Sequence, residues 1–209
     1  MNESSEQTVE PAVAANSEAD SGTEGWTYTP HLIIFFSSAC IMVVEVVAGR
    51  LIARHLGGSL YTWTSIIGVV LAGMSVGNYI GGRMADRWRP QQILGFLFTI
   101  SSMACLLTLP LNRLFALYPL TVFNWPLRVF TTVLIIFILP AICLGTLSPA
   151  TAKMALQRTR NVGTTLGSVY AWGAAGSIIG TLLTGFYLIA AVGSYGVVMF
   201  AAMGLAAAG

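Results

Sequence analysis

The sequence has few charged residues, and almost all of its acidic residues lie at one end. Only 9% of the 209 residues are charged, whereas a soluble globular domain carries about 25%. Six of the eight acidic residues lie in the first 25 positions, and beyond them only Glu45 and Asp86 are acidic. This deficit excludes an ordinary soluble domain and indicates a chain embedded in lipid.

The sequence also has few cysteines. Cys40, Cys105 and Cys143 each lie inside an apolar run, and no two have the close spacing typical of a metal site. We therefore expect them to be buried apolar side chains, and we expect no metal centre and no cofactor. The basic residues form no patch with interleaved aromatics, so nothing indicates a nucleic-acid partner.

Long apolar runs occupy most of the chain and predict an all-α, polytopic membrane protein with the lipid bilayer as its solvent. Crossing a bilayer takes about 20 apolar residues per helix. We predict six spans, at about 32–54, 62–82, 92–110, 128–147, 164–190 and 195–208. The last is short, so either it is a tilted span or the natural chain continues beyond Gly209.

The polar, acidic composition of residues 1–28 predicts a disordered tail before a transmembrane domain over 29–209. The turns at 83–91 and 148–163 each carry three Lys or Arg residues. The positive-inside rule places both turns, and with six spans both termini, in the cytoplasm of an inner (plasma) membrane protein. The bias is modest, because the opposing loops hold four arginines. A short surface helix is expected from 148 to 157, with Lys153 facing the headgroups.

Two similar segments lie three predicted helices apart. Gly58-Ser59-Leu60-Tyr61-Thr62-Trp63 precedes the second span, and Gly167-Ser168-Val169-Tyr170-Ala171-Trp172 opens the fifth. Helices three apart run in opposite directions through the membrane, so this similarity predicts an inverted repeat of three plus three helices. A chance match is the alternative.

Glycines recur at a spacing of four residues on two predicted spans. Gly73, Gly77 and Gly81 do so on the second span, and Gly176 and Gly180 on the fifth. Such ridges let helix backbones approach closely within lipid, so we expect helix packing there. A sliding contact in a transporter is the alternative.

Glu45 is an acid inside a predicted span, between Val44 and Val46. A charge there costs at least about 2.5 kcal/mol, so the carboxyl group needs a partner, a cavity or a proton. Arg50 lies about 140° around the helix and is poorly placed to pair with it; Arg54 is another candidate partner. Two interpretations stay open: a structural ion pair or neutral acid, and a site for a proton or a cationic substrate.

Gly82-Arg83-Met84-Ala85-Asp86-Arg87 resembles the loop between helices two and three of major facilitator superfamily transporters. The resemblance implies a cytoplasmic latch between helices in which Asp86 and Arg87 form the charge pair and Gly82 makes the tight turn. An ordinary positive-inside turn is the alternative.

The resemblance extends over roughly residues 32–208 to the membrane half of fused facilitator/spermidine-synthase proteins. It implies half of a facilitator fold, followed in that family by a cytoplasmic aminopropyltransferase-like domain. The residues that carry it are Glu45 with Arg50, the 58–63 turn, the glycine-rich second span, Gly145 with Pro149, and the segment 176–186.

Three functions are compatible with these patterns. No strand–turn–helix with a Gly-rich nucleotide turn occurs, so we expect the chain alone not to be an enzyme. The favoured function is a membrane module that anchors or assembles with a membrane or cytoplasmic protein, or forms a homodimer. The alternatives are a half-transporter of a cationic amine or proton-coupled solute, and a fragment of a membrane-bound aminopropyltransferase-like enzyme.

Overall fold

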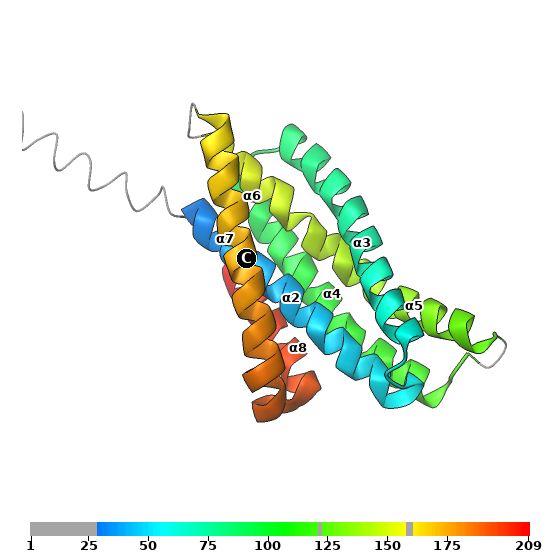
Figure 1. The fold of residues 1–209 in the computed structure, drawn as a ribbon. Coiled ribbons are helices and arrows are strands. Elements are labelled where there is room, and N and C mark those ends of the chain that lie inside the picture. The colour runs from blue at the N-terminus through cyan, green and yellow to red at the C-terminus, as the bar shows by residue number, and fades with distance from the viewer. Residues whose placement is uncertain (1–28, 121–122, 158–160) are drawn as a thin grey trace, which may run out of the picture.

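A computed structural model describes residues 29–120, 123–157 and 161–209 (Figure 1). Helices are the only regular secondary structure in these ranges. The predicted acidic tail over 1–28 lies outside the described residues, as do Arg158 and Arg160 of the second basic turn.

The helices follow one another with short connections. In chain order they are α2 (Thr29–Leu56), α3 (Leu60–Arg87), α4 (Pro90–Leu117), α5 (Trp125–Gly145), α6 (Leu147–Leu156), α7 (Val162–Leu183), the π-helical turn η1 (Thr184–Leu188) and α8 (Ile189–Ala208).

Local chemistry explains the tight turn between α2 and α3. Gly57 adopts a φ of 73°, a left-handed conformation that ends a helix at little cost for glycine. Ser59 then caps α3, because its hydroxyl oxygen accepts the backbone N–H of Thr62 at 3.3 Å. The two long helices therefore run antiparallel with only three residues between them.

Within the described ranges, five stretches of helix are long and apolar enough to cross a membrane, which agrees with the predicted all-helical, multi-pass chain. They are Pro30–Leu56, Leu60–Arg87, Gln91–Leu117, Trp125–Leu156 and Val162–Ala208. The first four match the first four predicted spans. The fifth contains both remaining predicted spans, so the count by length and composition is five rather than six.

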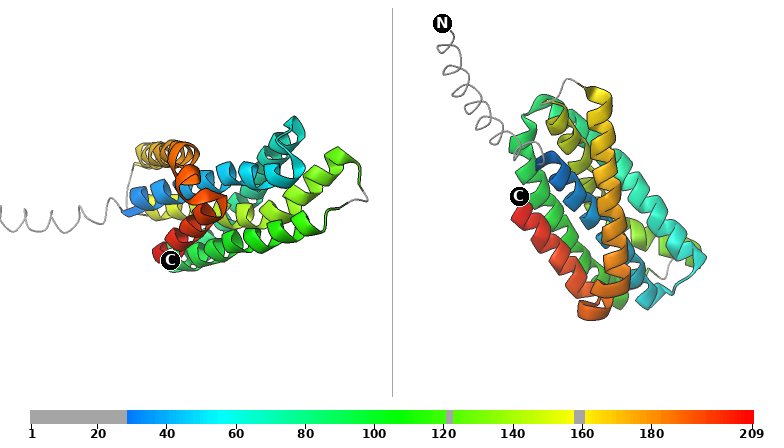
Figure 2. Two further views of the ribbon diagram at one scale, coloured as in Figure 1. Left: turned by 90° about the horizontal axis from the view of Figure 1, so that it is seen from below. Right: turned by 60° about the vertical axis from the view of Figure 1, so that its left-hand side comes forward.

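The fifth stretch bends sharply at Gly193. This residue has φ 70° and ψ 167°, which is not helical. The chain reverses there, and the arm from 194 to 208 runs back beside α2 and α4 (Figure 2). Ser102 on α4 donates a hydrogen bond to the carbonyl oxygen of Ala202 at 2.7 Å and ties this arm in place.

The helix over 147–156 is present, but the expectation of a surface location was wrong. Leu147, Ala150 and Thr151 have no exposed surface. The helix follows α5 directly and packs on α2, α3 and α4. Its apolar and small side chains are buried by these neighbours, so it extends the bundle instead of lying across headgroups.

The core surrounds α2, which contacts every other helix described. Val47, Ala48, Leu51 and Ile52 are fully buried along it. By contrast, large apolar side chains such as Phe186, 84% exposed, cover the outside of the bundle. An apolar exterior around an apolar interior is what a lipid solvent requires.

Candidate functional site

Close backbone contacts join α3 to α5 and α6. A Cβ atom on Gly73 would lie 2.5 Å from the Cβ of Ala141, and one on Gly81 would lie 2.5 Å from the carbonyl oxygen of Thr146. Gly77 is the tightest, since its Cβ would lie 2.2 Å from the carbonyl oxygen of Ile142. These separations leave no room for a side chain, so the glycines set the helix spacing.

The same kind of contact joins α7 to α2. A Cβ on Gly176 would lie 2.1 Å from the carbonyl oxygen of Phe35, and one on Gly180 would lie 2.6 Å from that of Ala39. The structure therefore places all five glycines singled out from the sequence at helix contacts, on two different helix pairs.

An ion pair joins α3 to α6 at the end of the bundle that carries the 83–91 turn. Lys153 donates to the carboxylate of Asp86, and within the described ranges no other ion pair occurs. Arg83 instead donates to the hydroxyl of Tyr79 at 2.8 Å. Asp86 thus forms no ion pair with its neighbour Arg87, and Lys153 reaches it from another helix.

Lys153 was missed as a partner because it lies 67 residues from Asp86 in the sequence. A signal was nevertheless available. Lys153 is the one lysine in the sequence, and Asp86 is the one acid in the predicted cytoplasmic turns. Their pairing differs from the Asp86–Arg87 pair that the family resemblance implies.

Glu45 lies half-buried on α2 beside an apolar cavity of about 10 Å³. Such a space holds about one water molecule. Its walls come from α2, α3 and α5 and include Val70, Met74 and Phe137. Among the described residues the carboxylate forms no hydrogen bond or ion pair, and neither Arg50 nor Arg54 contacts it.

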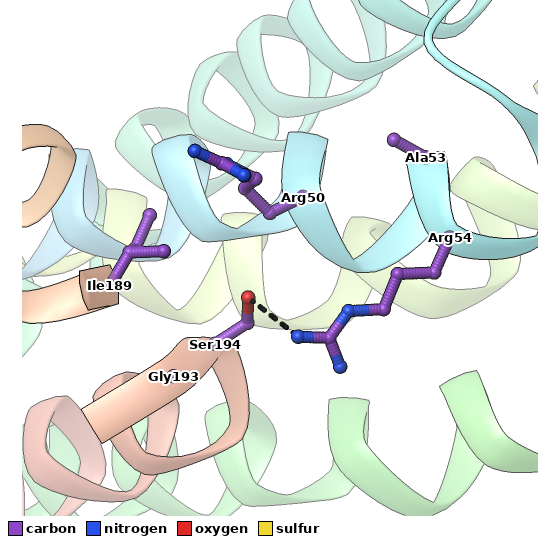
Figure 3. Close-up of a pocket in the computed structure, with 6 residues that line it drawn as sticks. All are labelled: Arg50, Ala53, Arg54, Ile189, Gly193 and Ser194. Atoms are coloured by element: carbon purple, nitrogen blue, oxygen red, sulfur yellow. Dashed lines mark hydrogen bonds between the residues drawn. The ribbon is translucent and has the colours of Figure 1, made fainter. Parts of the chain in front are cut away.

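The two arginines line a separate cavity of about 370 Å³ at the other end of the bundle. Figure 3 shows the Arg54 side chain reaching from α2 toward Ser194, whereas the Arg50 side chain extends away from Ser194. Arg54 donates to the hydroxyl of Ser194 at 3.4 Å. Ala53 and Ile189 complete the lining. The cavity thus forms where the end of α2 meets the reversal between η1 and α8.

A polar network supports this end of the bundle. The ring centroid of Tyr195 lies 5.6 Å from the guanidinium group of Arg54 and 5.1 Å from that of Arg113. Its hydroxyl accepts a hydrogen bond from Asn112 at 3.2 Å, and the Asn112 carbonyl oxygen pairs with His55 at 2.9 Å. These contacts link α2, α4 and α8 across long sequence separations, and no local pattern in the sequence indicated them.

In the part of the chain that the structure describes, no group of three or more metal-ligating side chains comes together. Comparison with protein-family models, with curated proteins and with solved structures finds no match to this chain. Among the described residues, the arginine cavity and the Asp86–Lys153 pair are two arrangements of polar groups that bear on function.

Proposed function

We propose that the chain is an integral membrane module that anchors or assembles with a partner protein. The observation that carries this proposal is the tight packing of the bundle. Glycine contacts bring the helix backbones together on two helix pairs, and apolar side chains fill the space around α2. The space beside Glu45 is about 10 Å³, roughly one water molecule, so within the described residues no solute-sized path reaches this carboxyl group.

The proposal includes six membrane crossings related by an inverted repeat. The reversal at Gly193 supports two crossings within the fifth stretch, although the arm from 194 to 208 is short for a full span. The pattern of contacts supports the repeat. Counting α6 with α5, the second helix packs on the fourth, and the fifth packs on the first. An inverted three-plus-three repeat relates the second helix to the fifth and the fourth to the first. It therefore predicts that if the second helix packs on the fourth, the fifth packs on the first.

The proposal also places the 83–91 turn and both ends of the chain on the cytoplasmic side of an inner (plasma) membrane. The last residue, Gly209, lies beside Gly95 near the start of α4. The first turn of α2 lies at the same end of the bundle (Figure 2). A partner would meet the module there, next to the Asp86–Lys153 pair.

The resemblance to the membrane half of fused facilitator/spermidine-synthase proteins remains part of the proposal. It makes an aminopropyltransferase-like protein or domain the expected cytoplasmic partner, with a second copy of the chain as the other candidate. A reading frame that continues past Gly209 into such a domain would instead favour the fragment of a membrane-bound enzyme.

The proposed module is tested by its assembly state in the membrane. The full chain is crosslinked in native membranes, purified in mild detergent and weighed by native mass spectrometry. We expect a fixed stoichiometry, either with a second copy or with one partner. A protein that stays monomeric after crosslinking would contradict the proposal.

Transport of a cationic amine is the second candidate, and Glu45 in a membrane-spanning helix is the observation that favours it. Proteoliposomes loaded with the purified chain are offered labelled spermidine. Uptake that disappears in Glu45→Gln and persists in the matched control Asp86→Asn would favour transport over the module.

A further inference from the structure

The arginine cavity carries positive charge without a neighbouring acid. Arg50 and Arg54 lie four residues apart on α2, which puts them on one face of the helix. The described residues include two acids, Glu45 and Asp86, and neither forms an ion pair with these arginines. Two like charges at this spacing repel each other. An anion between them would remove the repulsion and satisfy both guanidinium groups.

The opposite wall of the cavity adds further positive potential. After Gly193 a new helical arm begins at Ser194, and both residues line the cavity. The N-terminal end of a helix carries about half a positive charge. Arg113 lies over the ring of Tyr195, 5.1 Å from its centroid, and brings a third guanidinium group close to the same turn.

A second, apolar cavity of about 210 Å³ adjoins the first. The two share Arg50, Ala53 and Ile189 in their walls. The second cavity continues between α2 and α3, where Val46 and Trp63 line it. The ring of Trp63 lies 3.0 Å from the position that a Cβ on Gly49 would take, so the glycine makes room for this wall.

A polar, cationic compartment therefore opens into an apolar one at Arg50. A cationic cavity next to an apolar cavity matches a molecule with an anionic head and a hydrocarbon tail. The volume of the polar cavity, about 370 Å³, falls within the range of about 300–1,000 Å³ typical of ligand sites. In a membrane-embedded bundle, the surrounding molecules that combine a phosphate head with hydrocarbon tails are phospholipids.

We propose that this pair of cavities binds one anionic phospholipid. Arg50 and Arg54 hold its phosphate through charge-assisted hydrogen bonds, the Ser194 hydroxyl contributes a further hydrogen bond, and the first carbons of an acyl chain enter the cavity beside Trp63. This proposal rests on different residues from the membrane module proposed above, so either can fail without the other.

Native mass spectrometry of the full chain in detergent measures the binding directly. The protein is titrated with phosphatidylglycerol and with phosphatidylcholine of the same acyl chains. Both lipids carry the phosphate, but the choline cation of phosphatidylcholine cancels its charge and would lie against the two arginines, so we expect wild type to prefer phosphatidylglycerol by about tenfold or more. The double variant Arg50→Gln with Arg54→Gln should lose the preference. The matched control Arg89→Gln, which removes one charge from an exposed position at the other end of the bundle, should keep it.

Two competition experiments decide whether the bound phosphate belongs to a lipid or to a soluble molecule. Glycerol 3-phosphate and inorganic phosphate carry the anion without the tail, and we expect each to compete with phosphatidylglycerol only at a concentration at least about tenfold higher. Equal potency would overturn the phospholipid in favour of a soluble phosphate. If the double variant does not fold, the single variants Arg50→Gln and Arg54→Gln replace it. Wild type without a preference, or arginine variants that bind like Arg89→Gln, would overturn the proposal.

Discussion

Substitution of Gly77 by alanine tests the packing of α3 on α5. The new Cβ would lie 2.2 Å from the carbonyl oxygen of Ile142 and 3.0 Å from the Cα of Gly145. Both are backbone atoms, so no side-chain rotation relieves the contact. Because ordinary van der Waals contact begins at 3.4 Å, the two helices must separate locally by roughly 1 Å. Overpacking of this kind typically costs about 1–3 kcal/mol, and we expect the upper half of that range.

Reversible unfolding in mixed micelles measures this cost as a change in the free energy of unfolding. Gly68→Ala is the matched control, because it lies on the same helix and its Cβ would meet nothing within 4 Å. Alanine is favoured over glycine in a helix by about 1 kcal/mol, so the control should be neutral or stabilising. The reasoning is refuted if the two variants unfold with free energies that agree within about 0.5 kcal/mol.

Three further substitutions test separate features by the same unfolding measurement. Asp86→Asn should lower stability by about 0.2–1 kcal/mol, because its ion pair with Lys153 is partly exposed, and exchanging the two residues should restore most of the loss. Glu45→Gln should leave stability unchanged or raised; a loss of about 3–5 kcal/mol would reveal a buried ion pair instead. Gly193→Ala should cost about 1–3 kcal/mol, because its φ of 70° with ψ of 167° lies in a region that is essentially restricted to glycine. Gly185→Ala, with open space around its Cβ, should cost less.

The helices could be predicted from the sequence because their signals are local. Long apolar runs follow from the lipid solvent, and a spacing of four places Gly73, Gly77 and Gly81 on one face whatever the rest of the fold does. The sequence could not identify the helix that each ridge meets. That depends on how α5 and α2 are placed by the whole bundle.

The candidate sites were less accessible to prediction, because their partners lie far apart in the chain. Glu45, Arg50 and Arg54 are close in sequence and were considered as partners, yet neither arginine contacts Glu45, and Arg54 instead reaches Ser194, which is 140 residues away. The reversal that brings Ser194 there depends on one glycine inside an apolar run. The predicted gap between the fifth and sixth spans, 191–194, contains this reversal, but nothing in the sequence indicated that Ser194 would meet the end of α2.

Labelling of single cysteines tests the central claim that this chain crosses a bilayer repeatedly. In a variant whose three natural cysteines are replaced by alanine, a cysteine is placed at Leu60, 80% exposed at the start of α3, or at Arg89, just beyond its end. In intact cells a membrane-impermeant maleimide should label the first position, and the second only after permeabilisation. Labelling of both positions in intact cells would contradict the account, because the two ends of α3 would then lie on one side of the membrane.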